Sequence, residues 1–132
     1  MKPRVYLAGY TQETEYREHV KKYWGYHIDA FDPMTDIECD WTNGSPSVED
    51  YFHIVDEEKA TIETSDVVVA YIRRFTIGTS MEILHAYNNN IPVLIIAPNE
   101  KTERDLWLAY HSTKFFRTID ECFNYIKMNF NQ

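Results

Sequence analysis

Two runs of aliphatic and β-branched residues, at 66–72 and 91–97, constrain the fold of this chain more than any other feature. Both runs are continuous rather than alternating, which is typical of strands buried on both faces of a parallel sheet. Residues 78–89 between them carry apolar side chains at helical spacing and run into consecutive asparagines. A strand, a helix and a strand over about thirty residues predict a βαβ unit with a parallel crossover.

The flanking segments continue the alternation of strands and helices. Further strands are expected at 4–8, 27–31 and 115–117, and further helices at 13–24, 48–64, 103–110 and 119–130. Residues 34–47 show no clear period, so we expect a loop there, acting as a mobile lid beside a pocket. The pattern predicts one α/β domain over residues 1–132, a flavodoxin-like three-layer fold with a five-stranded, mostly parallel sheet. Such folds bind ligands beyond the carboxyl ends of their strands.

Charge and composition argue against several classes of protein. The 21 acidic residues against 13 lysines and arginines give a net charge of −8, which disfavours a partner that is a nucleic-acid polymer. No apolar run approaches the roughly 20 residues that span a membrane, and the start of the chain has no apolar signal region, so we expect a cytoplasmic protein without a membrane partner. Cys39 and Cys122 belong to no metal or redox motif and are expected to be free thiols. The dispersed histidines and the absence of glycine-rich nucleotide motifs predict no metal site and no cofactor.

Glu82 is the residue of greatest chemical interest, because the segment around it leaves a buried strand and enters a helix. A carboxylate in the first helical turn would lie in the positive field of the helix N-terminus, which favours its ionised form. Such a carboxylate can attack the anomeric carbon of a sugar and hold the sugar as an ester. The structural alternative is a capping box, because Thr79 and Glu82 have the T-x-x-E spacing. Local sequence leaves both interpretations open.

Several segments resemble the nucleoside 2-deoxyribosyltransferase family in order and approximate spacing. Residues 5–9 (VYLAG) are similar to the family's first strand, and residues 65–70 (SDVVVA) to its central strand. Residues 78–86 (GTSMEILHA) resemble its G-x-x-x-E-[LI]-x-x-A helix start. The resemblance covers residues 4 to about 97. It implies an enzyme that cleaves the N-glycosidic bond of a (deoxy)nucleoside through a glutamyl glycosyl-enzyme intermediate and transfers the sugar to another base.

The resemblance also implies roles for individual residues. Glu82 falls on the family's nucleophile, and Tyr6 falls on the tyrosine that contacts and orients that carboxylate. Glu58 falls on the acidic residue that holds the base and manages its proton, although the family usually has aspartate there, which leaves Asp56 as the alternative. For both acidic residues, the structural interpretation is a solvated helix face.

Five residues are expected to bind substrate: Gly9, Asp32, Thr76 and Gly78 near strand ends, and Ser112, which the resemblance brings to a neighbouring subunit's pocket. Deoxyribosyltransferases carry an aspartate six residues before the nucleophile, where this chain has Thr76. The related nucleoside 5′-monophosphate N-glycosidases have a hydroxyl residue there that contacts phosphate, so Thr76 favours a monophosphate. The loop after Gly9 favours the opposite, because it lacks the glycines and arginines of a phosphate cradle.

Alternatives to sugar transfer therefore stay open. One is a (deoxy)nucleoside 5′-monophosphate N-glycosidase, in which water resolves the intermediate. The others are a nucleotide-binding module without turnover and a NADase-like enzyme, because a fold alone does not establish activity. The expected partners are a small-molecule nucleoside or nucleotide and, as the resemblance implies, further copies of the chain in a homodimer or higher homo-oligomer.

Overall fold

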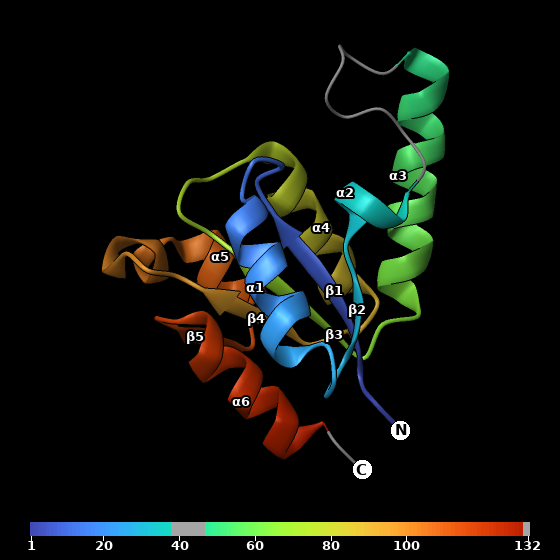
Figure 1. The fold of residues 1–132 in the computed structure, drawn as a ribbon. Helices are drawn as coiled ribbons and strands as arrows, with labels where there is room; N and C mark the ends of the chain where they lie inside the picture. The colour runs from blue at the N-terminus through green and yellow to red at the C-terminus, as the bar shows by residue number, and fades with distance from the viewer. Residues whose placement is uncertain (38–46, 131–132) are drawn as a thin grey trace.

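The computed structural model describes residues 1–37 and 47–130, and within these ranges the strands form a single sheet (Figure 1). The strands are β1 (Arg4–Gly9), β2 (Asp29–Phe31), β3 (Val67–Tyr71), β4 (Val93–Ile96) and β5 (Lys114–Phe116). They are arranged in the order β2-β1-β3-β4-β5, and every neighbouring pair is parallel. The predicted flavodoxin-like α/β fold is confirmed, and the sheet is wholly rather than mostly parallel.

Helices cover both faces of this sheet (Figure 1). They are α1 (Thr14–Trp24), α2 (Pro33–Asp36), α3 (Val48–Glu63), α4 (Ile77–Asn88), α5 (Leu106–His111) and α6 (Ile119–Asn129), with a 3₁₀ turn, η1 (Glu100–Arg104), before α5. One face packs against α1 and α6 through Tyr16 and Phe123, and the other against α3 and α4 through Ile62 and Ile83. Because both faces are covered, the middle strands must be apolar throughout, which accounts for the two continuous runs.

The prediction of a loop over residues 34–47 is wrong for its first residues, which belong to the short helix α2. Asp32 follows β2 directly and is the N-cap of α2, because its carboxylate accepts a hydrogen bond from the backbone N–H of Met34 at 2.9 Å. Pro33 occupies the first helical position, where its fixed φ suits a helix and its missing N–H costs nothing. Residues 38–46 lie outside the described residues, and so do Cys39 and the part of the chain predicted to act as a lid.

The helix predicted at 103–110 is wrong at its start. The chain forms the 3₁₀ turn η1 and then begins α5 at Leu106. Asp105 separates the two because its side chain accepts the N–H of Leu108 at 2.9 Å, the contact that defines an N-cap. After this break, α5 lies beside α4.

Two further observations concern the described residues. None of their helices has the length and apolarity required to cross a membrane. Cys122 is a free thiol in the core between α6 and the sheet, and burial raises its pKa well above the usual value. A thiol held in its neutral form in this way is a poor nucleophile.

Strand order creates a switch point between β1 and β3. The chain leaves β1 through α1 on one face of the sheet, and it leaves β3 through α4 on the other face. The loops at the carboxyl ends of these neighbouring strands therefore diverge toward opposite faces of the sheet. In parallel α/β sheets this is the place where ligands bind.

Candidate active site

A cleft of about 310 Å³ opens at the switch point. Its walls come from the loop after β1, the start of α2, the middle of α3 and the first turns of α4. Among the residues that line it are Gly9, Glu58, Thr76, Gly78 and Glu82, all predicted from the sequence as site residues. The fold thus brings residues from distant parts of the chain to one edge of the sheet.

Tyr6 lies behind the wall of this cleft and contacts Glu82 from inside the sheet. Its side chain on β1 is fully buried, and its phenol donates a hydrogen bond to the Glu82 carboxylate. The Tyr6 ring stacks on Phe31 of β2, with centroids 5.7 Å apart, which restricts its orientation. Burial and the nearby carboxylates Glu82 and Glu58 raise the pKa of Tyr6 far above its usual value. Near neutral pH, Tyr6 is therefore a protonated donor toward Glu82.

Glu58 and Glu82 form a pair of carboxyl groups that line the same cleft and influence each other's protonation. Burial, above all, and the charge of Glu58 raise the pKa of Glu82 to about 8, although the Tyr6 hydrogen bond opposes the increase. Burial also raises the pKa of Glu58. Two such groups titrate together, and near neutral pH the pair holds one proton. Asp56, the alternative to Glu58, is exposed on α3 and does not line the cleft.

The structure excludes the capping-box interpretation of Thr79 and Glu82. The N-cap of α4 is Thr76, whose hydroxyl accepts the N–H of Thr79 and donates to the Thr79 hydroxyl at 2.8 Å. Glu82 therefore lies beyond the first turn of α4 and caps nothing. The prediction that the helix N-terminus keeps Glu82 ionised is also wrong, because burial raises the pKa of Glu82 and favours its protonated form.

Two of the predicted substrate-binding residues do not line the cleft. Asp32 is 2% exposed, and its carboxylate lies 3.2 Å from Arg17 Nε and 2.7 Å from Lys21 Nζ. Ser112 follows α5, where its hydroxyl donates to the Leu108 carbonyl at 2.6 Å. Both side chains are thus engaged with groups of their own chain.

Sequence reasoning missed Arg17, which also lines the cleft. Arg17 could have been found, because it stands next to Tyr16 and three residues before Val20, within the apolar stripe of α1. A charged residue on the buried face of a helix needs a partner, so it points to a polar site in the fold. Pro33 and Met34 also line the cleft, at the start of α2.

The backbone of Gly9, in the wall of the cleft, has a conformation that a residue with a side chain rarely adopts. Its φ is +146°, and a Cβ there would lie 3.1 Å from the Tyr71 carbonyl oxygen. We expect Gly9→Ala to lower the free energy of unfolding by about 1–3 kcal/mol, measured by urea denaturation. Gly78→Ala is the matched control, because nothing lies within 4 Å of its Cβ position on α4. The control should be neutral or stabilising by up to about 1 kcal/mol, and equal losses in both variants would contradict the argument.

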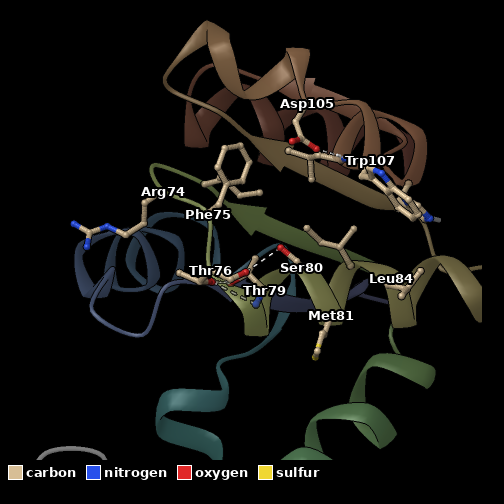
Figure 2. A pocket seen from close by; sticks show the side chains of 13 residues that line it. Arg74, Phe75, Thr76, Thr79, Ser80, Met81, Leu84, Asp105 and Trp107 are labelled. Atoms are coloured by element: carbon tan, nitrogen blue, oxygen red, sulfur yellow. Dashed lines mark hydrogen bonds between the residues drawn. The ribbon is translucent and has the colours of Figure 1, made fainter.

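A second hollow of about 380 Å³ lies on the other side of the α4 N-terminus, between α4 and α5 (Figure 2). Thr76 and Thr79 line both hollows. The walls of the second hollow are mainly apolar, with Phe75 and Trp107 exposed at 60% and 77%. Lacking the paired carboxyl groups, this hollow offers surface for packing rather than groups for acid–base chemistry.

Comparisons with known proteins agree with this architecture. Among solved structures, the 2-deoxyribosyltransferase of Bacillus psychrosaccharolyticus superposes with a TM-score of 0.74 at 20% identity, covering 92% of this chain and 91% of the other. A conserved protein from Enterococcus faecalis V583 gives 0.71 at 15% identity, with coverage of 97% and 99%. The CMP N-glycosidase of Clostridium botulinum gives 0.60 at 14% identity, with coverage of 93% and 97%. At such identities these similarities establish the fold.

The sequence itself identifies the family. A search of curated proteins returned no match. A family model described as nucleoside 2-deoxyribosyltransferase like matches residues 2–101, a region that contains β1, α3, β3 and α4 and thus all the walls of the cleft. The match confirms the resemblance noted in the sequence: the chain belongs to the nucleoside 2-deoxyribosyltransferase-like family.

Proposed function

We propose that this protein cleaves the N-glycosidic bond of a (deoxy)nucleoside and transfers the sugar to another base, with Glu82 as the nucleophile. The observation that carries the proposal is the hydrogen bond from the Tyr6 phenol to the Glu82 carboxylate, beside a cleft at the switch point. A carboxylate oriented in this way is suited to attack an anomeric carbon. Membership of the family supports the same reaction class.

The reaction would proceed in two displacements. A Glu82 oxygen attacks C1′ of the sugar, and the C1′–N bond breaks as the C1′–O bond forms. The bonding electrons leave with the base, and a proton from Glu58 neutralises the departing nitrogen. An acceptor base then attacks C1′ of the glycosyl ester, returns a proton to Glu58 and releases Glu82. Water in place of the acceptor would make the same enzyme a hydrolase.

These roles require the proton of the carboxyl pair to move from Glu82, whose protonated form burial favours, to Glu58. The reactive form needs its charge on Glu82 and its proton on Glu58, and the two carboxyl groups line the same cleft and influence each other's protonation. The Tyr6 hydrogen bond favours the ionised state of Glu82. Glu58 lines the cleft, so a base bound there would be within its reach.

The charge of the cleft supports a neutral 5′-hydroxyl rather than a 5′-phosphate on the substrate. Of the described residues that line the cleft, the ionisable acids are Glu58 and Glu82, and the single lysine or arginine is Arg17. The Arg17 guanidinium is already bonded to three backbone carbonyls and paired with Asp32. A phosphate would thus meet two carboxyl groups without a free cation to balance its charge. The Thr76 hydroxyl, the sequence feature that favoured phosphate, donates to Thr79.

One observation favours the 5′-monophosphate N-glycosidase as a second candidate. The first turn of α4 borders the cleft at Gly78, and nothing occupies the space within 4 Å of its Cβ position. The backbone N–H groups at the start of a helix lack partners within the helix and attract phosphate. The fold similarity to a CMP N-glycosidase is compatible with this candidate.

A product assay by chromatography separates these candidates. The protein would be incubated with deoxynucleosides and their 5′-monophosphates, with and without a second free base. Base exchange that requires the acceptor supports the transferase, whereas free base released only from monophosphates supports the hydrolase. No product from the whole panel would reject both and favour a binding module, or a NADase-like enzyme if nicotinamide is released from NAD.

We also propose that copies of this chain associate through the face formed by α4 and α5. Exposed aromatic and aliphatic side chains gather there, among them Phe75, Met81 and Trp107 (Figure 2). Trp107 and Tyr110 are 77% and 70% exposed. Contiguous apolar surface of this kind is typical of protein–protein interfaces. Ser112 at the end of α5 would then lie near the interface, as its expected contribution to a neighbouring subunit's pocket requires.

Trp107→Glu tests this association. A charge at the centre of an apolar interface is costly to bury, so we expect the variant to shift to a smaller species in sedimentation velocity experiments, with at least a tenfold weaker association. The matched control is Tyr26→Glu, which places the same charge on an aromatic residue that is 85% exposed elsewhere on the surface. An unchanged sedimentation coefficient for Trp107→Glu would reject this face as the interface.

A further inference from the structure

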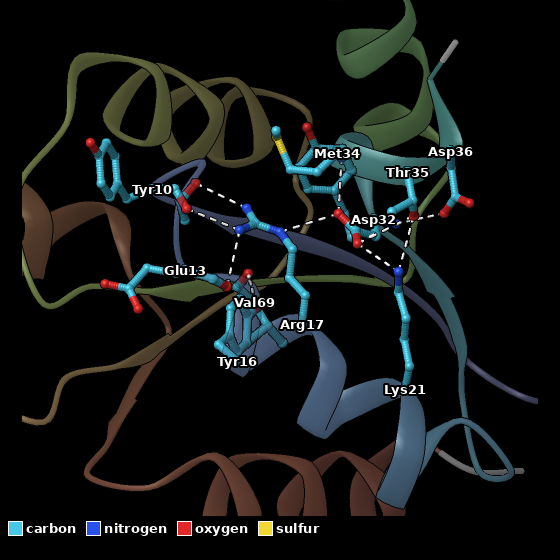
Figure 3. Close-up of polar contacts among 12 residues, drawn as sticks. Tyr10, Glu13, Tyr16, Arg17, Lys21, Asp32, Met34, Thr35, Asp36 and Val69 are labelled. Atoms are coloured by element: carbon cyan, nitrogen blue, oxygen red, sulfur yellow. Dashed lines mark hydrogen bonds and ion pairs between the residues drawn. The ribbon is translucent and has the colours of Figure 1, made fainter. Parts of the chain in front are cut away.

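Arg17 occupies the wall of the cleft and holds the loop that follows β1 (Figure 3). The side chain is 4% exposed. Its Nη1 donates to the carbonyls of Tyr10 at 2.9 Å and Glu13 at 3.3 Å, and its Nη2 donates to the carbonyl of Gly9 at 3.0 Å. A planar guanidinium can bind several carbonyls at once in a fixed geometry, which an ammonium group cannot do. Arg17 therefore determines where Gly9 and Tyr10 lie in the rim of the cleft.

Asp32 extends this contact to the opposite rim. Arg17 Nε lies 3.2 Å from Asp32 Oδ1 as an ion pair without an aligned hydrogen bond, and Lys21 Nζ lies 2.7 Å from Oδ2 (Figure 3). The same carboxylate caps α2 by accepting the Met34 N–H, and Met34 lines the cleft. The ion pair thus joins the loop after β1 to the helix after β2.

Arg17 also acts on the carboxyl pair through its charge. The titratable and charged groups that face the pair are Tyr6 on β1, Tyr16 and Arg17 on α1, Glu58 on α3 and Glu82 on α4. Arg17 is the cation in this set, and its charge lowers the pKa of both Glu58 and Glu82. Asp32 lies against Arg17 and offsets part of that charge.

We propose that Arg17 is a positioning residue for the reaction: it fixes both rims of the cleft through the β1 loop and Asp32, and it sets the charge balance around Glu58 and Glu82. The inference rests on the proposed function, because it concerns the same carboxyl pair. Stability alone is a weak explanation for the contact, since the desolvation of a buried ion pair offsets most of its attraction.

Three variants separate position from charge. Arg17→Lys keeps the charge but loses the guanidinium geometry, so kcat/KM should fall about 10- to 100-fold while the pH profile stays in place. Arg17→Gln loses both the charge and the guanidinium geometry, so the alkaline limb of the pH profile should also move to higher pH, by about 0.5–1 pH unit. Asp32→Asn retains a side chain that can cap α2 but removes the negative charge that offsets Arg17. Glu58 and Glu82 then experience the full Arg17 charge, so the alkaline limb of the pH profile should move to lower pH. Lys22→Gln, an exposed charge change on the same helix, is the control.

Carboxyl titration by ¹³C NMR on glutamate-labelled protein gives the same shifts without turnover. Opposite shifts of the Glu82 titration in Arg17→Gln and Asp32→Asn would support the proposal, and shifts in the same direction or none would overturn it. If Arg17→Gln does not fold, Arg17→Lys and Asp32→Asn decide the question. If the Glu82 titration shifts in opposite directions in the two variants but the wild type turns over none of the nucleosides and nucleotides in the product assay, the proposed function is wrong. If the wild type turns over a substrate but the Glu82 titration does not move in the variants, the role of Arg17 is wrong.

Discussion

Glu82→Gln is expected to reduce glycosidic cleavage by about 10³-fold or more while leaving the fold intact. The amide has nearly the shape of the carboxylate but cannot form the glycosyl ester, so the first displacement is lost. Its oxygen can still accept the Tyr6 hydrogen bond, which preserves the local contact. The measurement is the rate of base release from the best substrate of the panel, with far-ultraviolet circular dichroism to check the fold.

The matched control for this variant is Glu57→Gln, which removes an exposed carboxylate from α3. Its turnover should equal that of the wild type. Mass spectrometry of the protein with substrate and no acceptor should detect a glycosyl adduct on the wild type and none on Glu82→Gln. Wild-type turnover by Glu82→Gln would show that the nucleophile lies elsewhere.

The same substitution has a predictable effect on stability. The pKa of Glu82 is raised from its usual 4.5 to about 8, so the folded state binds this proton more tightly than the unfolded chain. The resulting stabilisation is complete below pH 4.5 and is lost as the pH rises toward about 8. Glu82→Gln does not titrate, so its free energy of unfolding should fall less than that of the wild type between these values. Denaturant titrations at both ends of the range measure the difference.

Glu58→Gln is expected to lower kcat by about 10²- to 10⁴-fold, the range for loss of a general acid. The departing base would leave without its proton, so the loss should be smallest for nucleosides whose bases are good leaving groups. The shape of the pH profile should change as well. In the wild type, the carboxyl pair loses its shared proton near pH 8, so activity should fall above that value.

The remaining activity of Glu58→Gln should lack this alkaline limb. Without the Glu58 charge, Glu82 also ionises at lower pH, because that charge contributes to its raised pKa. The measurement is kcat against pH for both proteins, with Glu57→Gln as the control that should retain the limb. If Glu58→Gln keeps the wild-type limb, the shared proton does not reside on this pair and another group must supply it.

Much of the fold was evident from patterns of a few residues. The runs at 66–72 and 91–97 contain β3 and β4, and the helical spacing between them matches α4 closely. A strand buried on both faces must be apolar throughout, and this requirement leaves a continuous signal in the sequence. Family motifs around Tyr6 and Glu82 lie on the same central elements, so these two candidates could be found before the structure.

Helix starts were less predictable, because several residues competed to cap the same helix. Thr76 and Thr79 both have hydroxyl groups able to cap α4, and the exit of the chain from β3 makes Thr76 the cap and buries Thr79. Asp32 and Asp105 are strong caps that begin α2 and α5. Which polar residue caps a helix depends on where the backbone turns, and local sequence leaves that choice open.

The sequence by itself determined the parallel α/β layers, the edge of the sheet that holds the site, and the candidates Tyr6 and Glu82. Only the tertiary structure decided that Glu58 rather than Asp56 lines the cleft and that Arg17 joins its two rims. It also reversed the expected protonation preference of Glu82. The physical reason is that periodicity records which side of an element is buried, whereas a pKa or a buried ion pair depends on groups that only folding brings together.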